Sequence, residues 1–160
     1  MDEFDYLFLE PLLIERITAQ VDGLQLVAGV PDLQTVAENQ NYSPAVYVIY
    51  LGDEIATGPA GQGGAKKIQT VTQNWAVVLA VYSADANGDG SEARRDAGPL
   101  LGKLISAVTG WKPSIDVNPF GRSARQSPVA YNAGYFYYPL VFTTSFVYPR
   151  IRTWQPSTSP

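Results

Sequence analysis

The sequence contains no cysteine and no histidine among its 160 residues. Without these side chains the protein cannot form a disulfide, a zinc–thiolate site, a cysteine nucleophile or a catalytic triad that uses histidine. Only 16% of the residues are charged, against about 25% in an average globular domain. The net charge of −4 argues against general nucleic-acid binding. No pair of carboxylates stands out for acid–base work, so we expect a protein that is not an enzyme and has no cofactor.

Long hydrophobic runs are also missing. The longest, residues 45–51 and 75–82, have the length of strands, whereas a membrane helix needs about 20 apolar residues. Three of the first five residues are acidic, where a secretory signal is basic. We therefore expect a soluble cytoplasmic product with no membrane partner. Hydrophobic residues still make up 46% of the chain, which is enough for the core of one domain.

The charges are distributed unevenly along the chain. Residues 1–60 carry ten acidic side chains and one basic one, Arg16, whereas residues 61–160 carry five acidic and ten basic side chains. The two parts have net charges of −9 and +5. Opposite charges on one small domain suit self-association or stacking on a complementary partner. The alternative is that folding mixes the two sets on one surface.

Apolar spacing and proline positions predict the helices. We expect a first helix at residues 11–21, a short one at 31–38 and a third at 99–109, with Gly110 just past its end. Because Gly98 and Pro99 suggest a kink or a fresh start, residues 92–97 are expected to form a separate first turn.

Alternation of apolar and polar residues predicts the strands. They are expected at residues 24–28, 45–51, 67–82, 122–131 and 135–148, and the strands at 45–51 and 67–82 should form a hairpin. Glycine-rich residues 52–66 predict a long mobile loop between these two. We expect a turn at residues 85–90, a hairpin turn at residues 132–134, and a sheet edge or a bulge at Pro139.

These elements predict one α+β domain spanning residues 1–160. We expect a mixed, mostly antiparallel sheet of four or five strands with the two main helices on one face. The ordered part should cover about residues 10–150, followed by a flexible tail at 151–160. The predicted core consists of Leu13, Ile17, Val48, Trp75, Val77, Leu79, Leu101, Leu104, Ile105, Leu140, Phe142 and Phe146.

One short motif resembles a calcium loop. Asp85, Asn87 and Asp89 alternate as oxygen ligands, Gly90 follows, and Asp96 stands where an EF-hand has its bidentate glutamate. However, a strand and not a helix precedes the motif, and Asp is shorter than Glu. Because Asp, Asn and Gly are also the ordinary turn residues, we favour a strand-to-helix turn without metal.

Tyrosine is abundant, and four of the ten tyrosines lie around the last predicted hairpin. Tyrosine and arginine are enriched at protein interfaces, whereas the alternative is an ordinary core strand with amphipathic side chains. Lys66 and Lys67 lie at the junction between the predicted loop and the predicted strand at 67–82, where charged side chains guard an edge. The candidate partner-interface residues are Lys66, Lys67, Arg122, Arg125, Tyr131, Tyr135, Tyr137, Arg150 and Arg152.

The order of these features resembles the phage tail-terminator family, in particular its small Mu-type minor tail proteins. The resemblance covers about residues 10–148. An amphipathic helix (LLIERITAQV, 12–21) leads to residues 24–30, a short DLQTVAE segment (32–38), and PAVYVI (44–49) before the glycine-rich loop. The strand VTQNWAVVLAV (71–81), a helix that ends in TGWKP (109–113), and an aromatic strand at 135–146 follow.

The resemblance implies a structural virion protein. It implies a ring, a hexamer, that caps the tail tube, ends tail growth and joins the tail to the neck or head-completion protein, with DNA only as passing cargo. The protein would assemble in the host cytoplasm and end in the virion. Two alternatives remain at this point: another neck or head–tail connector protein, and a small calcium-dependent binding module built on the loop from Asp85 to Asp96.

Overall fold

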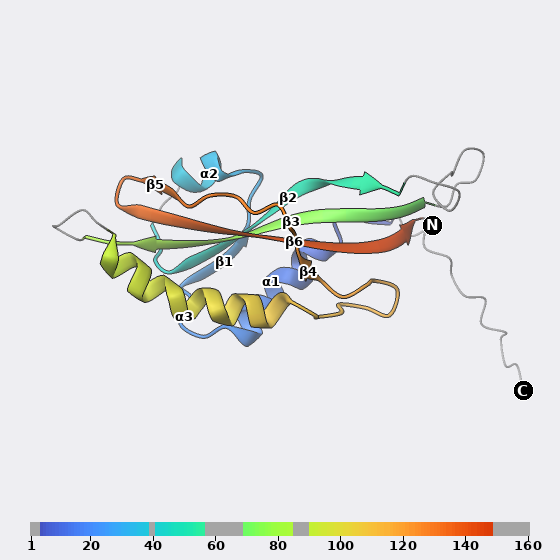
Figure 1. Cartoon of the computed structure of the whole chain (residues 1–160), viewed down its shortest axis with the longest axis horizontal. Helices are drawn as coiled ribbons and strands as arrows, with labels where there is room; N and C mark the ends of the chain where they lie inside the picture. Colours follow the sequence, from blue (N-terminus) through green and yellow to red (C-terminus); the bar gives the residue numbers. More distant parts are fainter. Residues whose placement is uncertain (1–3, 39–40, 57–68, 85–89, 149–160) are drawn as a thin grey trace, which may run out of the picture.

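A six-stranded mixed sheet runs through the molecule, with helices on both faces (Figure 1). The computed structural model describes residues 4–38, 41–56, 69–84 and 90–148. This is the predicted α+β architecture, with one strand more than expected. The elements in chain order are α1 (Leu9–Gln20), β1 (Leu26–Gly29), α2 (Leu33–Glu38), β2 (Ala45–Ile55), β3 (Gln69–Tyr82), α3 (Ser91–Val108), β4 (Gly121–Arg122), β5 (Ala130–Asn132) and β6 (Tyr135–Tyr148).

Strand β3 lies at the centre of the sheet, antiparallel to β2 on one side and to β6 on the other. Its pairing with β6 runs without a break from Gln69↔Tyr148 to Tyr82↔Tyr135. Strand β1 pairs parallel to β2 and forms one side of the sheet. Strands β4 and β5 lie end to end along the outer side of β6. The predicted hairpin of β2 and β3 is therefore confirmed.

The period-two pattern places the larger core on one face of the sheet. The odd-numbered apolar residues of β3 pack with α1, α3 and β6 into one cluster, in which Trp75 is fully buried. A smaller cluster lies on the opposite face, where Val36 of α2 covers Tyr47, Ala76 and Val78. The two main helices share one face, as predicted, and Figure 1 shows α2 on the other.

Ten of the twelve predicted core residues are buried, and Leu101 and Ile105 are half-buried. The buried side chains of helix α3 are mainly small: Ala93, Ala97 and Ala107, together with Leu104 and Val108. Leu101 and Ile105 flank these side chains, which explains their partial exposure.

Prolines caused wrong helix boundaries, and the short helix predicted to open at Pro31 begins instead at Leu33 as α2. Helix α1 begins at Leu9, so Pro11 is its third residue and not its first. The first four N–H groups of a helix have no partner within it, so the missing N–H costs little there. Helix α3 runs unbroken from Ser91 to Val108 with Pro99 inside it, so the predicted separate turn at 92–97 is wrong. Packing of Ala93 and Ala97 on the sheet explains how the helix continues despite one lost hydrogen bond.

Two predicted strand boundaries were also wrong. Strand β2 continues to Ile55 through a bulge between Tyr50 and Gly52, so the first part of the predicted glycine-rich loop is strand. Residues 57–68 lie outside the described part. The predicted strand at 122–131 consists of the two short strands β4 and β5, because the intervening residues leave the ladder.

The gap between β4 and β5 also explains how β6 accommodates a proline. Pro139 pairs with Val78 on its β3 side, while its other side faces the gap between β4 and β5. At Val141 the side chain of Gln126 replaces a strand: its Oε1 accepts from Val141 N at 3.1 Å, and its Nε2 donates to Val141 O at 3.1 Å. The backbone groups of residues two apart in a strand point the same way. The nitrogen of Pro139, which carries no hydrogen, therefore also faces this gap. The predicted local edge is therefore confirmed.

Candidate functional site

The predicted arginine–tyrosine surface lies on the outer side of β6. Arg122 and Arg125 are exposed there, and Tyr131 on β5 has 64% of its surface exposed. The hairpin turn holds β5 in place, since Ala133 and Gly134 have the positive φ angles of 50° and 87° that a two-residue hairpin loop requires. The Tyr131 ring packs at 4.9 Å from that of Phe136. The structure thus brings three of the nine candidate interface residues onto one side of the sheet.

Two other tyrosines of the candidate set do not present their rings in the same way. Tyr135 is half-buried, and Tyr137 is only 4% exposed. Tyr137 lies in the smaller core with Tyr47, directly across from the small residue Ala80 of β3. Its hydroxyl is buried with no hydrogen-bond partner in the described part of the chain. Burial raises the pKa of Tyr137 to about 12. In the single chain, Tyr137 therefore supports the sheet and offers no contact surface.

A groove separates the segment after β4 from β2 on the face that carries α2. Thr72, Asn74 and Thr143 line the sheet between these two walls, and the opening measures about 460 Å³. Glu54 stands on the β2 wall and Arg125 on the opposite wall. A second opening of about 330 Å³ continues toward α2 and shares Leu51 and Ser127 with the first.

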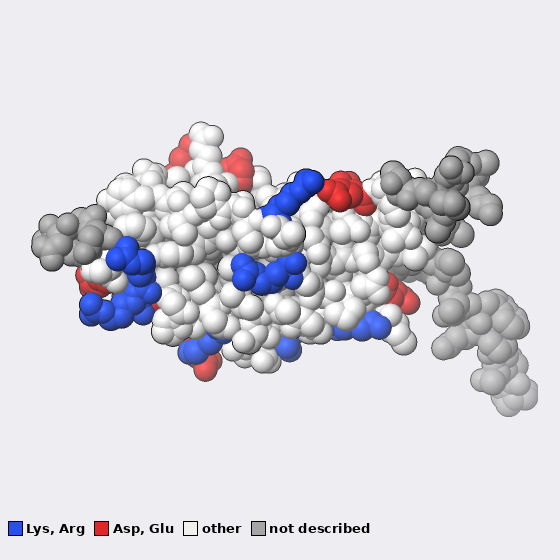
Figure 2. Space-filling view, in the orientation of Figure 1, with Lys and Arg blue, Asp and Glu red and all other residues white. Residues whose placement is uncertain are grey.

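Sheet topology keeps the acidic and basic parts of the chain apart. The first half of the chain supplies α1, α2 and the strands β1 and β2, whereas the second half supplies β3, α3 and the strands on the other side. Among the described residues, 4–56 carry eight acidic and one basic side chain, and 69–148 carry six basic and three acidic ones. Figure 2 looks onto the β4–β5 side, where Lys and Arg lie across the face and Asp and Glu toward its outline. The sequence halves are therefore largely spatial halves.

Arg16, the single base of the acidic half, is engaged between the two main helices. Its Nε donates to Ala107 O at 3.0 Å, and its guanidinium lies 5.5 Å from the centre of the Trp111 ring. The negative C-terminal end of the α3 dipole also stabilises a cation at this position. Arg16 therefore serves helix packing.

The other charges of the acidic half are on or near the surface. They include Asp53 and Glu54, which are exposed on the outer part of β2. Asp53 accepts a hydrogen bond from the Tyr6 hydroxyl, and burial, this bond and the nearby carboxylate together raise the pKa of Tyr6.

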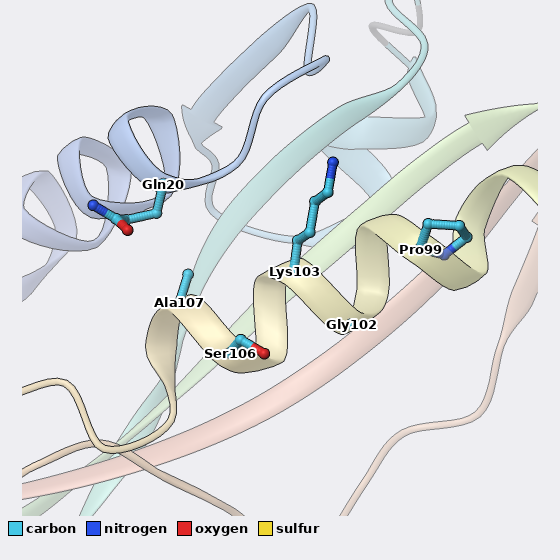
Figure 3. A pocket seen from close by; sticks show the side chains of 6 residues that line it. All are labelled: Gln20, Pro99, Gly102, Lys103, Ser106 and Ala107. Carbon is cyan, nitrogen blue, oxygen red and sulfur yellow. The ribbon is translucent and has the colours of Figure 1, made fainter.

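A cleft of about 470 Å³ separates α1 from α3 (Figure 3). Lys103 rises from α3 into the space between the helices, and Gln20 lies near the end of α1. The remaining lining is small or apolar: Pro99, Gly102, Ser106 and Ala107. Among the described residues no carboxylate lines this cleft, so its lining does not provide a pair for acid–base chemistry.

The remaining predicted sites are placed only in part. Asp85, Asn87 and Asp89 of the calcium motif lie outside the described residues, and Asp96 is exposed on α3. Within the described ranges, no group of three or more Asp and Glu side chains is close enough to hold a metal ion. Lys66, Lys67, Arg150, Arg152 and the predicted tail at 151–160 also lie outside the described part. None of the described helices is long and apolar enough to span a membrane.

Two glutamines with structural roles on β3 and beside β6 were not predicted from the sequence. Gln73 is fully buried and links Tyr6 to Trp75, and Gln126 substitutes for a strand beside β6. Gln73 has a detectable signal, because a polar residue stands at an apolar position of an alternating strand. Gln126 has none, since its role depends on the gap between β4 and β5.

One comparison identifies relatives of the chain. A family model described as "Phage tail terminator protein" matches residues 3–154, which is nearly the whole chain. No curated protein matches the sequence.

Proposed function

Because the chain belongs to the phage tail terminator family, we propose that its copies close into a hexameric ring that caps the tail tube and ends tube growth. Family membership makes the protein a structural component of the phage tail. In the proposed role the ring also joins the finished tail to a neck or head-completion protein. Assembly would take place in the host cytoplasm, and the protein would act through contacts and not through catalysis.

The family match carries this proposal, and the separated charges support it. A ring needs head-to-tail contacts, in which one surface of a copy binds a different surface of the next. A domain with a mainly acidic side and a mainly basic side is suited to such contacts, because like sides repel and unlike sides attract. A domain with both charges mixed would lack this preference.

The remaining partners follow from the same role. The face of the sheet that carries α1 and α3 differs in sequence and shape from the face that carries α2, so two different surfaces of the ring can bind the tube and the neck. DNA would pass through the central opening as cargo, and low positive charge in the channel would let it slide.

A tube-growth assay tests this function. Purified tail-tube protein of the same phage is polymerised with and without the present protein, and tube lengths are measured by electron microscopy. We expect added protein to stop elongation and to shorten the tubes in proportion to its concentration. Unchanged tube lengths, with no protein found at tube ends, would reject the capping role.

A further inference from the structure

Both sides of the sheet end in strand edges that have no neighbouring strand within the described residues. On one side, β1 covers β2 only from Ala45 to Val48, which leaves the outer part of β2 without a strand beside it. Leu51 and Ile55 on this part are 49% and 41% exposed. On the other side, β5 has β6 along one edge only.

Backbone groups at these edges point outward. Gln25 donates its N–H to Pro44 O, so alternation directs the N–H and C=O of Leu26 away from β2. In the β5–β6 hairpin, Asn132 and Tyr135 close a two-residue loop, so Tyr131 directs its backbone groups away from β6. Among the described residues, each side of the sheet therefore has backbone donors and acceptors without a neighbouring strand, and such groups commonly recruit another strand.

The edge strands on the two sides of the sheet lie at matching positions along the strand direction. Leu26 of β1 lies in one row with Ala130 of β5, through Ala45, Ala80 and Tyr137. A second row connects the outer part of β2 with β4, from Gly52 through Asn74 and Thr143 to Gly121. Copies placed side by side without sliding would thus bring β5 to β1 and β4 to β2. Both new pairs would be antiparallel, because β4 and β5 run opposite to β1 and β2.

The charges on these edges are complementary. The outer part of β2 carries Asp53 and Glu54, whereas the segment that begins at β4 carries Arg122 and Arg125, all exposed. Charged edge residues prevent a strand from pairing with its own kind and still permit pairing with an edge of opposite charge. Tyr131 adds a large exposed aromatic side chain at the β5 edge.

We infer that neighbouring copies of this chain join edge to edge, so that the β4–β5 side of one copy lies along the β1–β2 side of the next and the sheet continues across the contact. The segment of one copy that carries Arg122 and Arg125 then lies along the outer part of its neighbour's β2, which carries Asp53 and Glu54, and Tyr131 lies beside β1. This inference rests on the proposed ring and names the surfaces that would build it.

A mixing experiment with reversed charges tests the contact. Glu54→Arg and Arg125→Glu are prepared as separate proteins, and assembly is followed by analytical ultracentrifugation and native mass spectrometry. Each variant alone places like charges at every contact, so we expect its association to weaken at least about tenfold. An equimolar mixture restores opposite charges at every contact of an alternating assembly, so we expect multimers with equal amounts of both variants.

Mixing also separates contacts between copies from a contact within one copy. Glu54 and Arg125 of the same copy line one groove, and each single variant keeps two like charges there. If only that internal pair mattered, the mixture would assemble no better than the separate variants. Lys103→Glu, which changes the charge in the cleft between the helices, is the matched control and should assemble like the parent protein.

A second variant does not depend on charge. Tyr131→Ala should weaken association about tenfold, as expected for an interface aromatic residue. If the parent protein forms multimers that neither the charge variants nor Tyr131→Ala weaken, the edge contact is wrong and the proposed ring stands. A parent protein that stays monomeric, also with tail tubes present, would overturn both.

Discussion

Replacing Gln73 with leucine should show how the N-terminal segment is fixed to the sheet. Gln73 is fully buried. Its Nε2 donates to Tyr6 O at 2.9 Å, and its Oε1 accepts from Trp75 Nε1 at 3.1 Å. Leucine has a similar volume but can make neither bond, so the Trp75 N–H and the Tyr6 carbonyl lose their partners.

The expected cost is worked from these two bonds. Each neutral bond contributes about 1 kcal/mol, and each buried group left without a partner adds a further desolvation cost, which gives about 3 kcal/mol in total. For a domain of this size, 1 kcal/mol corresponds to roughly 2–4 °C, so the melting temperature should fall by roughly 6–12 °C. Residues 4–8 should also exchange their amide protons faster, because this segment loses its hydrogen bond to β3 and keeps only the ring contacts of Phe4, Tyr6 and Phe8 with β6.

Thermal and urea unfolding at one fixed protein concentration would measure the loss, and hydrogen exchange would locate it. Tyr6→Phe is the matched control, since it removes only the hydroxyl that donates to the exposed Asp53, and it should cost about 1 kcal/mol or less. A Gln73→Leu protein as stable as the parent, with unchanged exchange at residues 4–8, would refute the assigned role of this side chain.

Further predictions concern the contact of Arg16 with α3, the β5–β6 hairpin, the buried Tyr137 and the motif from Asp85 to Asp96. Arg16→Ala should cost about 1–2 kcal/mol in urea unfolding, because α1 loses its bond to Ala107 and its contact with Trp111. Gly134→Ala should cost about 1–2 kcal/mol, since φ is +87° and the new methyl group would lie 2.6 Å from Tyr82 Cε2, whereas Ala133→Gly should be neutral or stabilising. Tyr137→Phe should be neutral or stabilising at pH 7; it should also lose less stability between pH 10 and 12, where the unfolded tyrosine ionises before the buried one. Calorimetry should detect no calcium binding, and a signal that Asp89→Ala abolishes would contradict the interpretation of that loop as a turn.

Local patterns were sufficient for the parts of the fold in which one physical signal dominates. The alternation of residues 135–148 predicted β6 with its exact bounds, and Gly110, with φ of +78°, stands just after α3 as predicted. Family resemblance was also visible in the order of the elements, and the family match confirms it.

The features that the sequence did not predict correctly depend on contacts between residues that are far apart in the chain. Pro99 suggested a break, but packing of α3 on the sheet outweighs one lost hydrogen bond. The parity of Tyr137 placed it opposite the main core, yet α2 and β2 build a second core on that side. The order of the strands in the sheet decides whether the acidic and basic halves of the chain lie apart in space. No local sequence pattern specifies that order.

Electron microscopy of the purified protein incubated with assembled tail tubes tests the central claim most directly. The account predicts a closed ring, six-fold in projection, at one end of each tube and none along the tube wall. A protein that remains monomeric and never binds a tube end would contradict it.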